Sequence, residues 1–256
     1  MRRPRPARGP SSRKRSGSTS AGSLESNDAG VLTFAWRGCL FRVPDQVQAP
    51  KAGSLFFCRN LVVRPGERML EIGAGLGLAA VLAARSGARV VATDILPEAV
   101  EVIRANAALN GVVLDTRLGD CWAPVGDDRF DLVCTNPPQM PTPSGRARRD
   151  ATAAADNGGV DGWEILDRVI GGARAHLQPR GRLVFTIFAF LGLKRACAKL
   201  EAAGLEPTVV ASEIQSFPRI GYERLEHIRS LDTEATVGGG TPATIERFMI
   251  QGTVPA

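Results

Sequence analysis

Short apolar runs alternate with longer alanine- and leucine-rich segments along most of the chain. The runs are too short for helices and suit strands that are buried inside a sheet. The longer segments have the composition of helices, and several of them end at glycine or asparagine. The runs predict seven strands, at residues 68–72, 89–93, 112–118, 130–135, 182–188, 208–214 and 244–253.

The longer segments predict helices at residues 78–86, 97–109, 161–177 and 193–203. Strands and helices therefore alternate through most of the sequence, which is typical of an α/β fold with a parallel sheet. In such a fold, ligands bind in the crevice outside the carboxyl ends of the strands. Residues that directly follow a predicted strand are therefore the first candidates for a functional site.

Three consecutive regions are predicted along the chain. Residues 1–28 are mainly arginine, proline, serine and glycine, so they are expected to form a disordered basic tail. Residues 29–66 are expected to form a preface with one β-hairpin, at 31–43, and one helix, at 55–63. Residues 67–256 contain the alternating strands and helices and are expected to be the main domain.

The charge is unevenly distributed along the 256 residues. The formal net charge is +6, and residues 1–24 hold seven arginine or lysine residues and no acid. The remaining chain is therefore close to neutral. No aromatic residue is interleaved with these arginines, so a nucleic-acid-binding arm is not favoured over a solvated extension.

Cysteine usage and hydropathy exclude several other classes of protein. The five cysteines are scattered, no C-x-x-C occurs, and only two histidines are present, so neither a metal site nor a disulfide framework is predicted. This usage fits the reducing cytoplasm. No apolar stretch is long enough for a transmembrane helix, so no membrane association is expected.

A glycine-rich turn joins the first two strands of the predicted main domain. Glycine is needed where a backbone turns sharply or approaches a ligand closely, and the start of the following helix presents free N–H groups. An acid at the end of the second strand can accept both hydroxyls of a ribose. The residues in question are Glu71, Gly73, Ala74, Gly75, Gly77 and Asp94.

The spacing of these glycines is G-x-G-x-G, whereas the dinucleotide pattern is G-x-G-x-x-G. With Glu71 before it, the loop resembles the cofactor loop of class I S-adenosylmethionine-dependent methyltransferases. The resemblance implies S-adenosyl-L-methionine as the cofactor. It also implies a Rossmann-like, seven-stranded, mostly parallel sheet with helices on both faces and an antiparallel last strand. The fourth and fifth strands are expected beside the first.

The resemblance also assigns a cofactor-binding set. In the family, residues after the third strand flank the adenine, and Asp120 and Cys121 match them by position. Trp122 either packs on the adenine or belongs to ordinary packing. The expected cofactor-binding residues are Glu71, Gly73, Ala74, Gly75, Gly77, Asp94, Ile95, Asp120, Cys121 and Asn136.

Asn136-Pro137-Pro138 follows the fourth predicted strand directly. It resembles the N-P-P-(aromatic) motif of methyltransferases that act on DNA amino groups or on the glutamine amide of release factors. A planar nitrogen of this kind has a delocalised lone pair and is a poor nucleophile. The Asn136 side-chain oxygen and the Pro137 carbonyl can each accept one of its N–H groups, and the fixed φ of proline keeps that carbonyl rigid. Asn136 and Pro137 are therefore the expected catalytic residues.

A G-G-x-D-G segment at 158–162 extends the resemblance to the release-factor glutamine methyltransferases, over roughly residues 40–190. Two departures affect the expected substrate. Gln139 stands where the family has an aromatic residue, and only a short preface precedes residue 45 in place of the family's helical substrate domain. The expected acceptor is therefore an amide, amine or guanidine nitrogen of a small molecule or amino acid, for instance in natural-product biosynthesis.

The remaining predictions concern the walls of the site and the alternatives. The loop at 139–160 is expected to be functional or mobile, and the segment at 215–242 is expected to be a lid or part of the substrate wall. The expected substrate-binding residues are Pro138, Gln139, Tyr222 and Glu223. The open alternatives are a protein glutamine N-methyltransferase of the release-factor type, an NAD(P)-dependent oxidoreductase and a nucleic-acid-binding protein.

Overall fold

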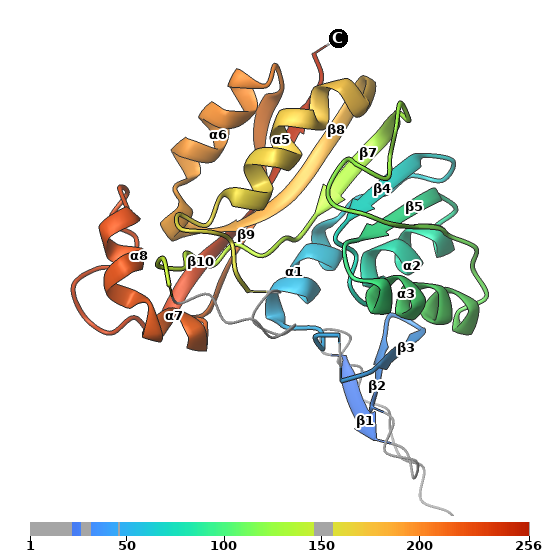
Figure 1. The fold of residues 1–256 in the computed structure, drawn as a ribbon, viewed down its shortest axis with the longest axis horizontal. Coiled ribbons are helices and arrows are strands. Elements are labelled where there is room, and N and C mark those ends of the chain that lie inside the picture. Colours follow the sequence, from blue (N-terminus) through green and yellow to red (C-terminus); the bar gives the residue numbers. More distant parts are fainter. Residues whose placement is uncertain (1–21, 27–31, 46, 146–155, 256) are drawn as a thin grey trace, which may run out of the picture.

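A seven-stranded sheet forms the middle of the structure (Figure 1). It consists of β4 (Arg68–Ile72), β5 (Arg89–Asp94), β6 (Asp115–Leu118), β7 (Phe130–Thr135), β8 (Leu177–Phe188), β9 (Glu206–Ser216) and β10 (Thr244–Thr253). The computed structural model describes residues 22–26, 32–45, 47–145 and 156–255. The strand order is β6-β5-β4-β7-β8-β10-β9. Only β10 runs antiparallel to its neighbours, which confirms the predicted α/β fold with an antiparallel last strand.

The order of the strands corrects one expectation. β4, the first strand of the sheet, lies between β5 and β7, whereas β8 pairs with β7 and does not touch β4. The prediction that the fourth and fifth strands both flank the first was therefore wrong for the fifth. The chain runs outward from β4 to β6 and then returns to the other side of β4. This reversal between β4 and β7 opens a crevice at their carboxyl ends.

Helices cover both faces of this sheet. They are α1 (Ala52–Asn60), α2 (Leu78–Arg85), α3 (Pro97–Leu109), α5 (Glu164–His176) and α6 (Leu193–Ala202), with a 3₁₀ turn η1 (Ala189–Leu191). Successive strand residues point to opposite faces. The buried side chain of Met69 packs in the cluster under α1, α2 and α3, and that of Leu70 packs in the cluster under α5. The two hydrophobic cores therefore lie on the two sides of one sheet.

A three-stranded sheet precedes the main one and packs against α3 (Figure 1). It contains β1 (Ser23–Ser26), β2 (Leu32–Trp36) and β3 (Cys39–Val43). The buried amide of Asn106 accepts the Arg42 N–H (2.8 Å) and donates to the carbonyl oxygens of Arg42 (3.2 Å) and Leu76 (3.0 Å). Asn106 therefore ties β3, α3 and the glycine-rich turn together.

The first residues of the chain differ in part from the expected tail. Ser23–Ser26 pair with β2, so four residues within the predicted tail form a strand. Apart from Gly22, the rest of that tail lies outside the described residues. The division into a preface at 29–66 and a main domain at 67–256 stays a prediction. The preface helix was expected at 55–63, and α1 begins and ends three residues earlier.

Two short helices, α7 (Arg219–Glu223) and α8 (Leu225–Leu231), lie between β9 and β10. They occupy the segment that was expected to cover the substrate. Within the described part of the chain, no helix is long and apolar enough to cross a membrane. The same residues contain no group of three or more His, Cys, Asp or Glu side chains placed to hold a metal ion.

Glu71 of β4 is a buried acid that holds the beginning of α2. Its Oε2 accepts the Ala80 N–H at 2.7 Å. Gly77 precedes α2 and has no side chain to cap its N–H groups, so the carboxyl group of Glu71 takes this role. Burial raises the pKa of Glu71 to about 8. The hydrogen bond from the Ala80 N–H lowers this pKa, and the nearby Asp94 carboxylate raises it.

This raised pKa predicts that the protein loses stability as the pH rises. The ordinary value is 4.5, so the neutral acid stabilises the folded state fully below pH 4.5, and this contribution disappears as the pH passes about 8. Glutamine stays neutral at all these pH values. Between pH 5 and pH 8.5 we therefore expect the free energy of unfolding to fall less for Glu71→Gln than for the wild type, with a difference on the order of a few kcal/mol. Urea titrations at several pH values measure this difference. The exposed Glu206 provides the control substitution, Glu206→Gln. Parallel curves for wild type and Glu71→Gln would contradict the assignment.

Candidate active site

The pairing of β4 with β7 brings the two sequence motifs together. Ile72 and Thr135 are register partners, and the Thr135 hydroxyl donates to the Ile72 carbonyl at 2.9 Å. Gly73 and Asn136 are the next residues on the two parallel strands. The glycine-rich turn and the Asn-Pro-Pro motif therefore begin side by side at the carboxyl edge of the sheet.

The glycines of the turn are needed for two different reasons. Gly73 (φ +69°) and Gly75 (φ +56°) have left-handed backbones, and a Cβ built on either would meet no atom within 4 Å. Both residues therefore face open space. Gly77 (φ +76°) is buried, and a Cβ there would lie 3.2 Å from the Ile103 side chain. The first two glycines leave room for a ligand, whereas the third lets the turn pack on α3.

Asp94 ends β5 and faces this turn. Its Oδ2 accepts the Gly75 N–H at 2.9 Å, and its Oδ1 accepts the Leu96 N–H at 3.0 Å. The carboxylate is buried and holds the turn in place in this structure. The next residue, Ile95, is 60% exposed, which is unusual for an isoleucine. An acid and an apolar side chain thus stand together beside the open glycines.

Two other members of the expected cofactor-binding set, Glu71 and Ala74, form hydrogen bonds to other residues of the protein. Glu71 is only 6% exposed and holds α2, so the structure places its carboxyl group below the turn. Ala74 is buried and donates its N–H to the Thr93 carbonyl at 2.9 Å. Their side chains support the turn from behind, which differs from the direct cofactor contact expected from the sequence.

Asp120 and Cys121 follow β6. The Arg168 guanidinium lies 2.6 Å from Asp120 and lowers the pKa of this half-exposed carboxyl. Burial raises the pKa of the Cys121 thiol to about 11, and the residue has φ +46°. Trp122 stacks on His176, with ring centroids 4.5 Å apart and an interplanar angle of 8°, so the structure favours ordinary packing for this side chain.

Asn136 is half-buried and contacts two side chains from the neighbouring strands. Its Oδ1 accepts the Thr186 hydroxyl at 2.6 Å and lies 3.5 Å from Nη1 of Arg247. Burial lowers the pKa of Arg247 to about 10, so the guanidinium still carries its charge at neutral pH. Thr186 and Arg247 carry no signal in the sequence, because both lie inside strands and become neighbours of Asn136 only in the folded sheet.

Gln139 has a structural role that corrects the expected contact with a substrate. The side chain is 4% exposed. Its Oε1 accepts the Phe188 N–H at 2.9 Å, and its Nε2 donates to the Thr186 carbonyl at 3.2 Å and to the Pro137 carbonyl at 3.4 Å. Both ends of the amide are therefore used to join the Asn-Pro-Pro turn to the end of β8. Pro137 is buried and Pro138 is half-buried in the same turn.

The G-G-x-D-G segment packs directly on this turn. A Cβ at Gly158 would lie 2.6 Å from Cα of Gln139, and one at Gly162 would lie 2.7 Å from the Gln139 carbonyl oxygen. Only glycine permits so close an approach of two backbones. Asp161 accepts the Trp163 N–H at 3.1 Å and pairs with Arg195 at 2.5 Å, which fixes the start of α5. This segment therefore clamps the motif after β7.

The short helices α7 and α8 contact the same region through Arg224, which the sequence did not indicate, and through His227, which lies in the segment expected to cover the substrate. Buried Arg224 donates to the Thr142 hydroxyl at 2.7 Å, and the His227 ring nitrogen lies 2.6 Å from the Val160 carbonyl oxygen. Tyr222 donates to the Pro242 carbonyl at 2.8 Å and is 41% exposed, and Glu223 is exposed. The helices thus reach the loop beyond the Asn-Pro-Pro motif, and their described contacts do not include Asn136.

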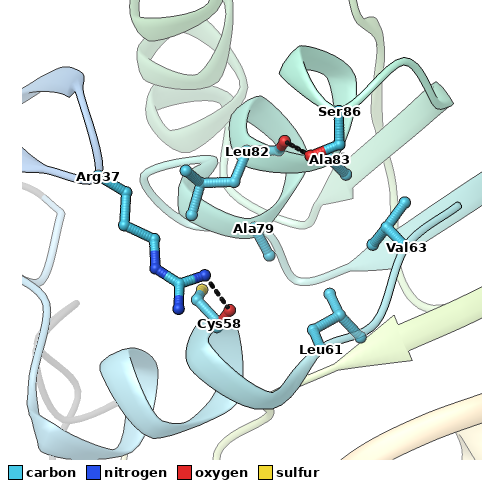
Figure 2. A pocket seen from close by; sticks show the side chains of 8 residues that line it. All are labelled: Arg37, Cys58, Leu61, Val63, Ala79, Leu82, Ala83 and Ser86. Atoms are coloured by element: carbon cyan, nitrogen blue, oxygen red, sulfur yellow. Dashed lines mark hydrogen bonds between the residues drawn. The ribbon is translucent and has the colours of Figure 1, made fainter. Parts of the chain in front are cut away.

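A hollow on another part of the surface is shown in Figure 2. It lies between the β2–β3 turn, α1 and α2, where Arg37 donates to the Cys58 carbonyl at 3.4 Å. The residues that line it are Arg37, Cys58, Leu61, Val63, Ala79, Leu82, Ala83 and Ser86. None of them belongs to the glycine-rich turn or to the Asn-Pro-Pro motif, so this hollow is separate from the candidate active site.

Comparisons with known proteins agree with this geometry. Residues 48–153 match the family model "Methyltransferase small domain". A Methanocaldococcus jannaschii protein assigned as a protein N5-glutamine methyltransferase is 32% identical over 68% of this chain and 88% of its own length. The release factor glutamine methyltransferase of Cereibacter sphaeroides is 35% identical over 73% of this chain and 70% of its own length. The ribosomal protein uL3 glutamine methyltransferase of Bradyrhizobium diazoefficiens is 39% identical over 47% and 40%.

Solved structures show the same fold. The Mtq2-Trm112 complex of E. cuniculi, described as responsible for methylation of the translation termination factor eRF1, matches 82% of this chain and 99% of its own (TM-score 0.55, 17% identity). A 16S rRNA N2 G1207 methyltransferase of T. thermophilus, solved with AdoMet and guanosine, matches 91% of this chain and 50% of its own (TM-score 0.55, 17% identity).

These findings overturn the expected partner. The relatives are named for the methylation of glutamine in release factors and a ribosomal protein, so a small-molecule or amino-acid acceptor is not supported. The open glycines fit the cofactor of this family, and an oxidoreductase is not supported either. The chain is an S-adenosylmethionine-dependent enzyme, and it belongs to the class I methyltransferases, in the release-factor glutamine methyltransferase-like group that carries the Asn-Pro-Pro motif.

Proposed function

We propose that this enzyme methylates the side-chain amide nitrogen of a glutamine within a protein. The observation that carries the proposal is the juxtaposition of Asn136 with the open glycine-rich turn across the β4–β7 pair. An acceptor for amide N–H groups thus stands beside the space for the methyl donor. The names of the relatives supply the class of acceptor, a glutamine in a protein of the translation apparatus.

On the donor side, we assign the cofactor to the space before Gly73 and Gly75. Asp94, at the end of β5, is the acid that can accept ribose hydroxyls, and exposed Ile95 offers an apolar surface beside it. Asp120 and Cys121 lie at the end of β6, the next strand along the same edge. The cofactor, once bound here, supplies a methyl group on a positively charged sulfur. Glu71 and Ala74 contribute through the shape of the turn.

On the acceptor side, Asn136 and Pro137 hold the glutamine amide. Each presents an oxygen that accepts one of the two N–H groups, which orients the nitrogen lone pair toward the methyl carbon. The new N–C bond forms as the C–S bond breaks, and the nitrogen then loses one proton to solvent. Alignment of the reactants in this way lowers the barrier by up to roughly 7–11 kcal/mol, so no covalent intermediate with the protein is required.

The contacts of Gln139 explain how this enzyme can lack the aromatic residue that the family has at this position. It crosses from the Asn-Pro-Pro turn to the backbone of β8 and thereby fixes the Pro137 carbonyl from behind. The acceptor must then be oriented by its own hydrogen bonds and by the described residues around Thr142 and Gly158. A glutamine anchored in a folded protein arrives with such additional contacts, whereas a free amide does not.

The acceptor is tested directly by transfer of an isotopically labelled methyl group. The enzyme is incubated with the labelled cofactor and, separately, with the release factors and the ribosomal proteins of the same organism. We expect one of these proteins to gain one methyl group on a glutamine, located by peptide mass spectrometry. The two arms distinguish the release factor from the ribosomal protein. Label that enters only low-molecular-weight compounds, or no protein at all, would overturn the proposal.

The role of Asn136 predicts a specific kinetic effect. We expect Asn136→Ala to lower kcat for the protein acceptor roughly 100-fold or more, while the dissociation constant for the cofactor changes little. Asn60, which is also half-buried but ends α1 away from the site, provides the control Asn60→Ala. Stopped-flow or steady-state kinetics with the labelled cofactor measure kcat, and calorimetry measures binding. An unchanged kcat would remove Asn136 from the mechanism.

The open glycines predict where added bulk blocks the cofactor. A methyl group at Gly75 enters the space before the turn, so we expect Gly75→Ala to weaken cofactor binding roughly tenfold or more. Gly111 also has a left-handed backbone (φ +66°) and nothing within 4 Å of a built Cβ, but it follows α3 outside the site. Gly111→Ala therefore reproduces the backbone strain without the block. Equal affinities of the two variants, measured by calorimetry, would show that the cofactor lies elsewhere.

A further inference from the structure

Arg247 is a buried cation of β10 at the edge of the candidate active site. It is 7% exposed, and its guanidinium carbon lies 3.8 Å from the centroid of the Phe188 ring. Gly53 of α1 approaches so closely that a Cβ there would lie 2.9 Å from this carbon. Among the described residues, no carboxylate forms an ion pair with Arg247. The carboxylate of Glu213, the register partner of Arg247 on β9, attracts this charge but forms its ion pair with Arg59. A buried charge without a direct ion-pair partner is costly to the fold, which points to a role beyond stability.

The hydrogen bonds of Arg247 have a defined direction. Its Nε donates to Oε1 of Gln215 at 3.1 Å, and its Nη1 donates to the Thr186 hydroxyl at 3.1 Å. A guanidinium can only donate. The Thr186 oxygen therefore accepts from Arg247, and its own proton is directed to the Asn136 side chain, 2.6 Å away.

This direction determines which end of the Asn136 amide faces Thr186. The Thr186 hydroxyl alone does not determine the orientation of this amide, because a hydroxyl can accept from the amide nitrogen or donate to the amide oxygen. With Nη1 of Arg247 also 3.5 Å away, the reversed amide would set its N–H₂ group against the guanidinium and leave the Thr186 proton without this acceptor. Arg247 therefore selects the orientation in which Oδ1 is held on this side.

We propose that Arg247 is a positioning residue for methyl transfer, which acts through Thr186 to fix the carboxamide of Asn136. The proposal rests on the function proposed above. Thr186 occupies one acceptor site of Oδ1 with a short bond, while Arg247 at 3.5 Å makes only a long contact with the same oxygen. The second acceptor site therefore stays available for an N–H of the glutamine amide, at an oxygen whose place is fixed before the substrate arrives.

Paired substitutions test this role. Thr186→Val removes the hydroxyl, and Arg247→Met removes the donors but keeps a long side chain suited to a buried site. We expect each to lower kcat roughly 10- to 100-fold, with little change in cofactor affinity. Thr186→Ser and Arg247→Lys keep a hydroxyl and a cation, and we expect both to recover a large part of the activity. Thr253→Val, which removes a hydroxyl at the other end of β10, is the control.

The same substitutions in the Asn136→Ala background separate positioning from simple loss of packing. If Arg247 and Thr186 act through Asn136, Arg247→Met and Thr186→Val cause no further loss once Asn136 is removed. Equal losses in both backgrounds would overturn the positioning role and leave the proposed function intact. A wild-type kcat for Asn136→Ala itself would instead remove the proposed role of Asn136. Unfolding midpoints measured for all variants show whether each is folded. If Arg247→Met or Thr186→Val does not fold, the same comparison is made with the conservative variants Arg247→Lys and Thr186→Ser.

Discussion

The hydrogen-bonded pairing of β4 with β7 is the constraint on which the rest of the structure depends. These strands lie next to each other in the sheet, although the chain between them forms two further strands and α2 and α3. Because Ile72 and Thr135 are register partners, the two turns that follow them begin at the same level. A shift by one residue would point the side chain of Asn136 to the other face of the sheet. The chemistry of the site therefore depends on the register of one parallel strand pair.

Polar groups buried around this pair hold the two turns from below. Glu71 fixes the first residues of α2, Asp94 fixes Gly75, and Gln139 fixes the Asn-Pro-Pro turn to β8. Each bonds to backbone groups, N–H groups for the two acids and both N–H and carbonyl groups for Gln139, so each defines the path of the main chain rather than the position of another side chain. A site that binds a ligand through glycines needs such support, because glycines impose little conformational restriction of their own. The buried polar residues thus restrict the backbone of the glycines that leave the space open.

The sequence predicts the fold well where local signals mark the ends of elements. The bounds of β4, β7, α3 and β10 are as expected, because glycine, proline or a change of hydrophobic pattern stands at most of their ends. α1 has no side-chain cap at Lys51, and its start was placed too late. In the candidate site, the sequence indicated the glycines, the residues after β5 and β6 and the Asn-Pro-Pro motif, but not the side chains that contact Asn136. Arg247 directly follows Glu246 in β10 and looks like an ordinary solvent-facing residue, and its contact with Asn136 spans 111 positions of sequence. Gln139 likewise finds its partners on β8. Such long-range polar contacts leave no periodic signal in the chain.

The polar ties of α7 and α8 have a consequence for how this enzyme can diversify. Arg224 and His227 attach these helices to the loops around Thr142 and Val160, and none of the four residues touches the glycine-rich turn. In the proposed arrangement the methyl donor lies at the edge of β4 to β6, whereas α7 and α8 belong to the other half of the sheet, between β9 and β10. A change in the insertion between β9 and β10 is therefore expected to affect the choice of acceptor more than the proposed donor site. The fold in this way keeps the proposed donor half of the sheet apart from the half that carries α7 and α8.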